Sequence, residues 1–503
     1  MPIIRRRAAQ ADPNRWERFA FTGASALLLI AAFPPFNMRW LVLVALVPWF
    51  TVLARCKGRQ AAATGFLFGF VYFAYQMYWL FPFVFKWTGK FGLAVAPWMV
   101  TALIAGVFHL GLALLLRGCW ALRKPWLVPL VWAGFEGFRA YVWGLAFPWA
   151  MVAQPLWPFP ALLQSAAWGT VFLVSAAVAA INLLIAESLY PTEDALAGRP
   201  RQIVAGAVGV LLLLSLIRYN LPNRGAKHDI MLYQPGVDQA FTPPDEELRR
   251  LTDVGADLRT LLAKDPPDLT VLPEGFALAS SYDFPPTPLG VKPAAPVLLG
   301  GNFLDEGDLR YQTAYLWNGE TWQRANKTRL VVFGEYVPGR ESIPLLKNFK
   351  IAEYDLTPGD TLQVMDSPVG KVGQLLCFEG LFPDLAARQN MIGSQAIAIM
   401  AIDDWYDNTP AWDQLWSSGI FRSIESGLPL WRVGSRGRTF ATDSRGRITH
   451  WLENRDQDAL RFEAEVPAGS DAFGYRFAFV WLCWAVMLYV GIRVLILRPD
   501  RLN

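Results

Sequence analysis

The hexapeptide QLLCFE at residues 374–379 indicates how the central part of this 503-residue chain folds. It begins with an apolar run short enough for a buried β-strand and ends in Cys377 and Glu379. A second run of this kind, TVLPE at 270–274, ends in Glu274. Because α/β sheets usually build their sites at the carboxyl ends of strands, the two runs predict a layered α/β domain with both side chains at a site.

Further short apolar runs, separated by turn signals and amphipathic stretches, extend this pattern and favour α/β layers. We predict strands at 228–233, 269–272, 296–303, 373–377, 396–402, 430–433 and 439–442. A helix is predicted at 412–426, stopped by Gly427, with Arg422 and Glu425 one turn apart.

The composition divides the chain between two environments. Hydrophobic residues make up 53% and charged residues only 17%, against about 25% charged in soluble proteins, which indicates a membrane protein. Residues 226–470 hold 34 acidic and 23 basic residues, whereas the rest holds 8 acidic and 23 basic ones. We therefore expect an acidic, water-soluble domain joined to a membrane part flanked by basic residues, and no nucleic-acid partner.

Apolar runs of about 17 to 25 residues predict eight membrane-spanning helices. They lie at 18–33, 40–54, 61–84, 92–116, 126–152, 161–186, 203–217 and 477–497, and the first, second and seventh are short. The first run, preceded by Arg5, Arg6 and Arg7, has a signal peptide as its alternative, although no clear cleavage site precedes Pro34.

The basic residues set the orientation, because cytoplasmic loops carry an excess of Lys and Arg. This rule predicts a cytoplasmic N-terminus at 1–18, seven helices at 19–224, an extracytoplasmic domain at 225–472, and an eighth helix with a cytoplasmic C-terminus at 473–503. The α/β domain is thus inserted between helices 7 and 8.

Several common chemistries are not indicated. The three histidines are scattered, HExxH is absent, and no GxSxG, Walker or GxGxxG pattern occurs in a suitable context. We therefore expect no metal and no cofactor. Cys377 is the only cysteine of the acidic domain, so it has no disulfide partner there.

A third segment, NKTRLVVFGEYVP at 326–338, adds Lys327 and Glu335. A thiol must lose its proton to attack an ester or amide, and a carboxylate such as Glu274 can accept that proton. A nearby lysine can stabilise the oxyanion that develops. Glu, Lys and Cys are thus sufficient for acyl transfer, although Cys377 alone would more often be a small buried hydrophobic residue.

These three segments resemble the Glu-Lys-Cys triad of the carbon-nitrogen hydrolase (nitrilase) superfamily, whose fold is α-β-β-α. The membrane part resembles the apolipoprotein N-acyltransferase family at AFPPF (32–36), at the segment 69–79, and at FEGFR (135–139) followed by AFPW (146–149). The resemblance implies that Glu274 is the general base, Lys327 the oxyanion lysine and Cys377 the nucleophile. Glu335 and Glu379 match supporting carboxylates.

The resemblance also implies a reaction and a place. Cys377 would take a fatty acyl chain from a membrane phospholipid as a thioester, and the amine of a diacylglyceryl-cysteine on an apolipoprotein would accept it. The enzyme would be a monomer in a bacterial inner membrane, with its catalytic domain on the periplasmic side. Aromatic and basic residues near the site or at headgroup level are candidates for substrate binding: Phe378, Trp405, Tyr406, Trp79, Arg139 and Trp149.

Some segments differ from the family pattern. Phe378 stands where tyrosine is common, and AIDDWY (401–406) and VGSRG (433–437) differ from the usual residues. These differences leave two alternatives: a membrane-tethered amidase or acyltransferase with another acceptor, and a non-catalytic scaffold that binds lipoproteins. For Glu136 and Arg139, one helical turn apart, an internal ion pair is the alternative to a headgroup contact.

Overall fold

The computed structural model describes residues 12–142, 146–191, 196, 198–277, 289–340, 342, 355–406, 409–470 and 472–496. Arg5, Arg6 and Arg7, which belong to the predicted cytoplasmic N-terminus, lie outside these ranges. The chain forms two compact units. The helical unit comprises Met1–Arg218, Thr409–Gln414 and Tyr475–Asn503, and the sheet unit comprises Tyr219–Asn408 and Leu415–Gly474.

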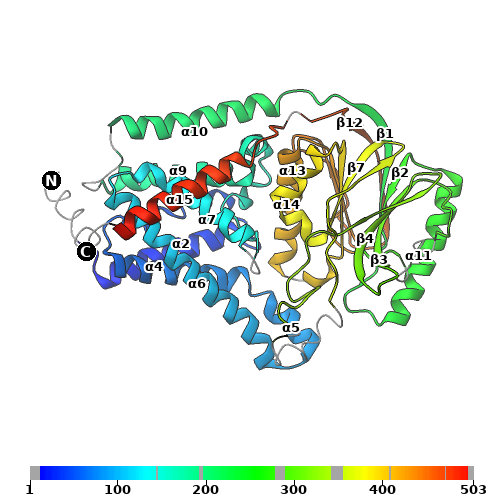
Figure 1. Ribbon diagram of the computed structural model, residues 1–503, viewed down its shortest axis with the longest axis horizontal. Helices are drawn as coiled ribbons and strands as arrows, with labels where there is room; N and C mark the ends of the chain where they lie inside the picture. The colour runs from blue at the N-terminus through cyan, green and yellow to red at the C-terminus, as the bar shows by residue number, and fades with distance from the viewer. Residues whose placement is uncertain are drawn as a thin grey trace. The chain divides into compact units, whose positions relative to one another are not determined.

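The helical unit contains a helix in every region where we predicted a span (Figure 1). Its longer helices are α2 (Arg15–Ala32), α4 (Gly58–Gln76), α6 (Phe91–Ala121), α7 (Val128–Tyr141), α9 (Ala166–Leu189), α10 (Gly198–Tyr219) and α15 (Ala478–Ile496). Shorter elements are η1 (Arg39–Leu43), α3 (Val47–Leu53), α5 (Leu80–Thr88), η2 (Pro125–Leu127), η3 (Gln154–Leu156) and α8 (Pro160–Leu163).

By length and composition, four of the described helices can cross a membrane, namely α6, α9, α10 and α15. A fifth span results if α4 and α5 are counted together, although they are bent by 51° at the break between them. The predicted third span, 61–84, therefore contains a break between Gln76 and Leu80. The count of eight spans stays a prediction.

The predicted fifth span, 126–152, is also too long. Helix α7 ends at Tyr141 because Val142 has an extended conformation, with φ −60° and ψ 127°. The Phe147 backbone N–H donates to the Arg139 carbonyl at 3.0 Å. Residues 146–149 are not helical.

The sheet unit is built on two six-stranded sheets. The first has the order β12-β1-β2-β3-β4-β5 and the second β11-β10-β9-β8-β7-β6. Strands β1, β2 and β3 run parallel to one another, as do β7, β8 and β9, and the remaining pairs are antiparallel. The first sheet comprises β1 (Ala226–Gln234), β2 (Leu269–Val271), β3 (Val297–Leu304), β4 (Arg310–Trp317), β5 (Trp322–Asn326) and β12 (Asp458–Val466). The second comprises β6 (Val364–Ser367), β7 (Gly370–Leu376), β8 (Ala396–Ala401), β9 (Leu430–Gly434), β10 (Phe440–Thr442) and β11 (Ile448–Trp451).

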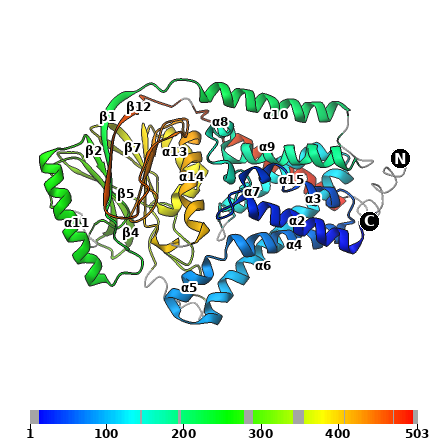
Figure 2. The ribbon, with the colours of Figure 1, turned by 180° about the vertical axis from the view of Figure 1, so that it is seen from behind.

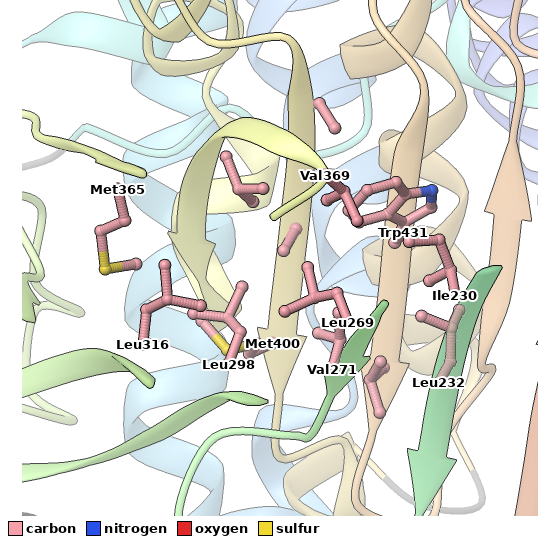
Figure 3. Close-up of a cluster of buried hydrophobic side chains, with 14 of the residues drawn as sticks. Ile230, Leu232, Leu269, Val271, Leu298, Leu316, Met365, Val369, Met400 and Trp431 are labelled. Atoms are coloured by element: carbon pink, nitrogen blue, oxygen red, sulfur yellow. The ribbon is translucent and has the colours of Figure 1, made fainter. Parts of the chain in front are cut away.

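A hydrophobic core joins the two sheets face to face. Figure 3 shows Leu232, Val271 and Leu298 of the first sheet in the same cluster as Met400 and Trp431 of the second. These side chains are buried because the inner faces of packed sheets exclude water, which is the main source of their stabilisation.

Helices cover the two outer faces. The amphipathic α11 (Pro244–Lys264) packs Leu251 and Leu258 against the first sheet. On the second sheet lie α13 (Pro383–Met391) and α14 (Pro410–Ser426) (Figures 1 and 2). Trp416 of α14 packs edge-to-face on Phe440 of β10. The order of layers is α-β-β-α, as predicted.

All seven predicted strands fall on observed strands, and α14 ends before Gly427, whose φ is +68°. Five strands were not predicted: β4, β5, β6, β11 and β12. One of them, β5, leads directly into Lys327.

Candidate active site

Three strand ends bring Glu274, Lys327 and Cys377 together in the sheet unit. Glu274 follows β2, Lys327 directly follows β5, and Cys377 directly follows β7 as the first residue of the 3₁₀ helix η4 (Cys377–Leu381). The site thus takes two residues from the first sheet and one from the second. All three are buried.

Lys327 lies between two carboxylates. Its Nζ is 2.6 Å from Glu335 Oε1 and 3.4 Å from Glu274 Oε1. Its backbone is fixed as well, because its N–H donates to Gln312 at 2.8 Å and its carbonyl accepts from Gly359 at 2.7 Å. Burial alone would lower the pKa of Lys327, but Glu274 and Glu335 raise it well above its ordinary value. The site therefore holds a permanent cation.

Glu274 is placed to exchange a proton with Cys377. The Cys377 thiol donates a hydrogen bond to the Glu274 carboxylate. Burial raises the pKa of Glu274, and the Lys327 cation opposes this rise. A carboxylate with a raised pKa is a better proton acceptor. The position depends on Gly300, because a Cβ there would lie 2.6 Å from Glu274 Cα.

Cys377 combines burial with an unusual backbone conformation. Only 8% of the residue is exposed, and its φ of +49° lies in the left-handed region, which is uncommon for a residue other than glycine. Burial and then Glu274 raise the pKa of its thiol well above the ordinary value, while Lys327 lowers it. The resting group at neutral pH is a thiol, so reaction requires a base.

Glu379 joins the loops that carry Lys327 and Cys377. One oxygen accepts from the Thr328 N–H and hydroxyl, both at 2.8 Å, and from the Arg329 N–H at 3.0 Å. The other accepts from the Leu376 N–H at 3.0 Å. Glu335 likewise accepts from Val331 N–H at 2.9 Å besides binding Lys327. Both carboxylates anchor the loops of the site.

The other candidates from the sheet unit lie in different surroundings. Phe378 is buried with its ring edge-to-face on Phe382. Trp405 packs edge-to-face on Phe241. Tyr406 lies close enough to the triad for Cys377 and Lys327 to shift the pKa of the Tyr406 hydroxyl. Burial and then Cys377 raise this pKa well above the ordinary value, and Lys327 lowers it.

Trp79, Arg139 and Trp149 gather in the helical unit. The Trp79 and Trp149 rings lie 5.8 Å apart, and Arg139 donates to the Trp149 carbonyl. Glu136 accepts from the Val152 N–H at 2.8 Å. These contacts hold the irregular segment around residues 149–152, which favours the structural role for Glu136 and Arg139.

Sequence reasoning missed several side chains around the site. Asp403 forms a paired contact with Arg432, at 2.9 and 2.5 Å, and lies close enough to Cys377 to raise the pKa of the thiol. Ser418 and Arg422 contact the turn that carries Cys377. The signals in the sequence were the spacing of Arg422 and Glu425 and, for Asp403, the segment AIDDWY (401–406), which differs from the family pattern. Across the described residues, no three His, Cys, Asp or Glu side chains gather as they would around a metal ion.

Comparison with known proteins identifies both parts of the chain. Residues 25–184 match the apolipoprotein N-acyltransferase N-terminal domain, and residues 292–459 match the carbon-nitrogen hydrolase domain. The second match includes Lys327 and Cys377, whereas Glu274 lies before it.

Relatives cover most of the chain. The apolipoprotein N-acyltransferase of Geobacter metallireducens is 28% identical over 92% of both chains, and that of Allorhizobium ampelinum is 29% identical over 78% of this chain and 77% of its own. Among solved structures, Nit3 of Saccharomyces cerevisiae aligns with 47% of this chain and 90% of its own at 18% identity and a TM-score of 0.37. The chain thus carries a domain that matches the N-terminal domain of apolipoprotein N-acyltransferases and a domain that matches the carbon-nitrogen hydrolases, and it is similar to apolipoprotein N-acyltransferases over most of its length.

Proposed function

We propose that this chain moves a fatty acyl chain from a membrane phospholipid to the amine of a diacylglyceryl-cysteine on an apolipoprotein, through a thioester on Cys377. The observation that carries the proposal is the buried contact of Cys377 with Glu274 beside the Lys327 cation. The names of the relatives supply the two substrates.

In the first half-reaction, Glu274 takes the thiol proton as the Cys377 sulfur attacks the phospholipid ester carbonyl. The oxyanion that forms is stabilised by the Lys327 cation, which Glu335 holds in place. When the oxyanion collapses, the C–O bond breaks and Glu274 returns its proton to the leaving alkoxide. The products are a lysophospholipid and an acyl thioester.

In the second half-reaction, the amine of the acceptor attacks the thioester carbonyl. Glu274 takes a proton from the amine, the C–S bond breaks, and the sulfur recovers a proton from Glu274. An amide is formed and the resting thiol is restored. The ester and then the thioester supply the driving force, so these steps call for no nucleotide.

The same proposal places the enzyme in a bacterial inner membrane, as a monomer with the sheet unit on the periplasmic side. The apolar helices α6, α9, α10 and α15 support a membrane location. Basic residues between the predicted spans support the orientation.

One alternative has a specific observation in its favour. The match to the carbon-nitrogen hydrolase domain is compatible with water, rather than an amine, resolving the thioester. A membrane-tethered hydrolase would release free fatty acid and form no acylated amine. The scaffold alternative is less favoured, because Glu274, Lys327 and Cys377 are all present and in contact.

Intact-protein mass spectrometry of the membrane-purified chain tests the first half-reaction. With phospholipid but no acceptor, the wild type should gain the mass of one acyl chain in a form that hydroxylamine removes. Cys377→Ala should gain none, whereas the control Cys483→Ala, which removes a thiol of the helical unit, should behave as the wild type. An equal adduct on Cys377→Ala, or none on the folded wild type, would refute the thioester.

Adding a diacylglyceryl-peptide then identifies the acceptor. Loss of the adduct together with appearance of an N-acylated peptide supports the transferase. Loss of the adduct with release of free fatty acid alone supports the hydrolase.

A further inference from the structure

Helix α14 contacts the turn η4, which carries Cys377, at the carboxyl end of the turn. The turn η4 ends with the carbonyls of Gly380 and Leu381, and each accepts a hydrogen bond from a side chain of α14. The Ser418 hydroxyl shares its one proton between Leu415 O of its own helix, at 2.6 Å, and Gly380 O of the turn, at 3.1 Å. The Arg422 guanidinium donates to Leu381 O. Both side chains are buried, at 7% and 2% residue exposure.

Glu425 aims the Arg422 guanidinium at this turn. Arg422 Nη2 donates to Glu425 Oε1 at 3.0 Å, and Nε lies 2.7 Å from Oε2. A buried ion pair of this kind adds little net stability, since well-packed apolar residues often serve as well. What it does provide is a fixed direction for the remaining N–H groups of the guanidinium.

The turn needs such support because its first residue is strained. Cys377, with φ +49°, occupies a left-handed backbone conformation that persists only where the surroundings enforce it. Glu379 fixes the front of the turn through the Leu376 N–H. Ser418 and Arg422 fix its other end, so the turn is held on both sides of the nucleophile.

We propose that Ser418 and Arg422, with Glu425 behind Arg422, are positioning residues that keep the Cys377 sulfur within reach of Glu274. Neither contacts the reacting atoms, and both act through the turn η4. The inference rests on the proposed function only for the name of the reaction, because the position of the thiol can be measured without any acyl donor.

Two serines of α14 provide a matched test. Ser418→Ala removes a buried hydroxyl shared between the turn and the Leu415 carbonyl. Ser423→Ala removes a buried hydroxyl shared between two carbonyls away from the turn, those of Leu428, at 3.0 Å, and Asp443, at 2.6 Å. In the full-length protein, Ser418→Ala should slow formation of the acyl-enzyme about fivefold, the value of one hydrogen bond. Ser423→Ala should leave this rate unchanged.

The pH profile of Cys377 alkylation separates positioning from general destabilisation. It is measured with iodoacetamide and read on the Cys377 peptide by mass spectrometry. In Ser418→Ala the profile should move to lower pH, because a relaxed turn weakens both burial and the contact with Glu274, which raise the pKa of the thiol. In Ser423→Ala it should match the wild type.

The double variant Arg422→Leu/Glu425→Leu gives a larger effect without leaving a lone buried charge. Loss of alignment at this level should slow acyl-enzyme formation about 100-fold with the same downward shift of the alkylation profile. Wild-type rates and profiles in both Ser418→Ala and the double variant, or equal losses in the two serine variants, would overturn the inference. If the double variant does not fold, the acylation rates and alkylation profiles of Ser418→Ala and Ser423→Ala test the inference on their own.

The test also separates the inference from the proposed function. A wild-type protein that forms no acyl-enzyme contradicts the proposed function. The alkylation profiles of the serine variants then still show whether α14 positions the thiol.

Discussion

Lys327 and Glu274 act on Cys377 in opposite directions, which gives the triad a distinctive titration. Burial and Glu274 raise the pKa of the thiol, and Lys327 lowers it. We expect the alkylation rate of the wild type to rise with pH through a midpoint above the ordinary thiol value of about 8.5. Lys327→Met should move this midpoint further up, and Glu274→Gln should move it down.

The reactivity of these two variants should not follow their thiol pKa. Glu274→Gln lowers the pKa of the thiol, so the thiolate forms more readily. The substitution also removes the base, however, and should lower the rate of acyl-enzyme formation by about 10²- to 10⁴-fold. Rapid-quench measurement of the acyl-enzyme alongside the alkylation profile checks both effects. A shift of both profiles in the same direction would contradict the assigned charges.

Asp404 gives the sheet unit a pH-dependent stability. Its Oδ2 accepts from the Ser435 hydroxyl at 2.6 Å, and burial, with Asp238 and Asp403 nearby, raises the pKa of its carboxyl to about 7. A raised pKa means that the protonated form is favoured in the folded state. Its stabilisation is therefore complete below the ordinary pKa of about 4 and is lost as the pH rises through 7.

We expect Asp404→Asn to remove this dependence. The wild type should lose on the order of 2 kcal/mol between pH 5 and 7, and the variant should lose much less. Apparent melting temperatures of the full-length protein in detergent, followed by tryptophan fluorescence from pH 5 to 8, provide the comparison. Parallel curves for the two proteins would assign the effect to another group.

The triad was predictable from sequence because each member is attached to a local pattern. Cys377 and Glu274 end apolar strands, and Lys327 lies within a recognisable segment. Ser418 had no such signal, and Asp403 was marked only as part of AIDDWY (401–406), a segment that differs from the family pattern. Serine and aspartate occur in many loops and helices, and the contacts that give these two a role come from segments that only the tertiary structure brings near.

At the level of elements, sequence analysis found strands that contain a continuous apolar run, and it missed β4 although residues 313–317 are buried, because polar residues interrupt its apolar pattern. β8 (Ala396–Ala401) is buried throughout and reads as a continuous apolar run. The strand β12 was missed because its buried residues alternate with exposed ones from Glu463 to Val466. β5 was missed because it contains Gln323 and Arg324. A search for continuous runs detects central strands and overlooks edges.

Close helix packing in the helical unit depends on glycine. On α4, a Cβ at Gly65 would lie 2.4 Å from the His109 carbonyl oxygen and 2.5 Å from Ala113 Cβ, both on α6. Membrane helices approach closely where small residues meet. Gly65→Ala should therefore force α4 and α6 apart and cost about 1 to 3 kcal/mol.

The matched control is Gly111→Ala on α6, where an added Cβ meets nothing within 4 Å. Thermal unfolding in detergent should show a lower midpoint for Gly65→Ala, and a midpoint for Gly111→Ala at or above that of the wild type, since alanine favours helix. Equal midpoints for the two variants would show that α4 and α6 adapt without cost.

At the scale of the whole molecule, the division into two units followed from charge and hydropathy, but the number of membrane crossings did not. Hydropathy measures how apolar a segment is and does not show where the backbone bends. The break between α4 and α5, and the end of α7 at Tyr141, are set by packing within the unit. Eight, five and four crossings are therefore separate hypotheses with different consequences for where the loops lie.

Three single cysteines distinguish these hypotheses in a background without the native thiols. Arg59→Cys lies in the first turn of α4, Lys90→Cys between α5 and α6, and Asp456→Cys in the sheet unit, and all three positions are exposed. Eight crossings with a cytoplasmic N-terminus predict that a membrane-impermeant maleimide labels Lys90→Cys and Asp456→Cys in intact spheroplasts, and Arg59→Cys only after permeabilisation. With five crossings, Arg59→Cys and Asp456→Cys share a side and Lys90→Cys lies opposite. With four crossings, Arg59→Cys and Lys90→Cys share a side opposite Asp456→Cys.

Labelling of Asp456→Cys only after permeabilisation would place the sheet unit in the cytoplasm and exclude a periplasmic lipoprotein as its acceptor.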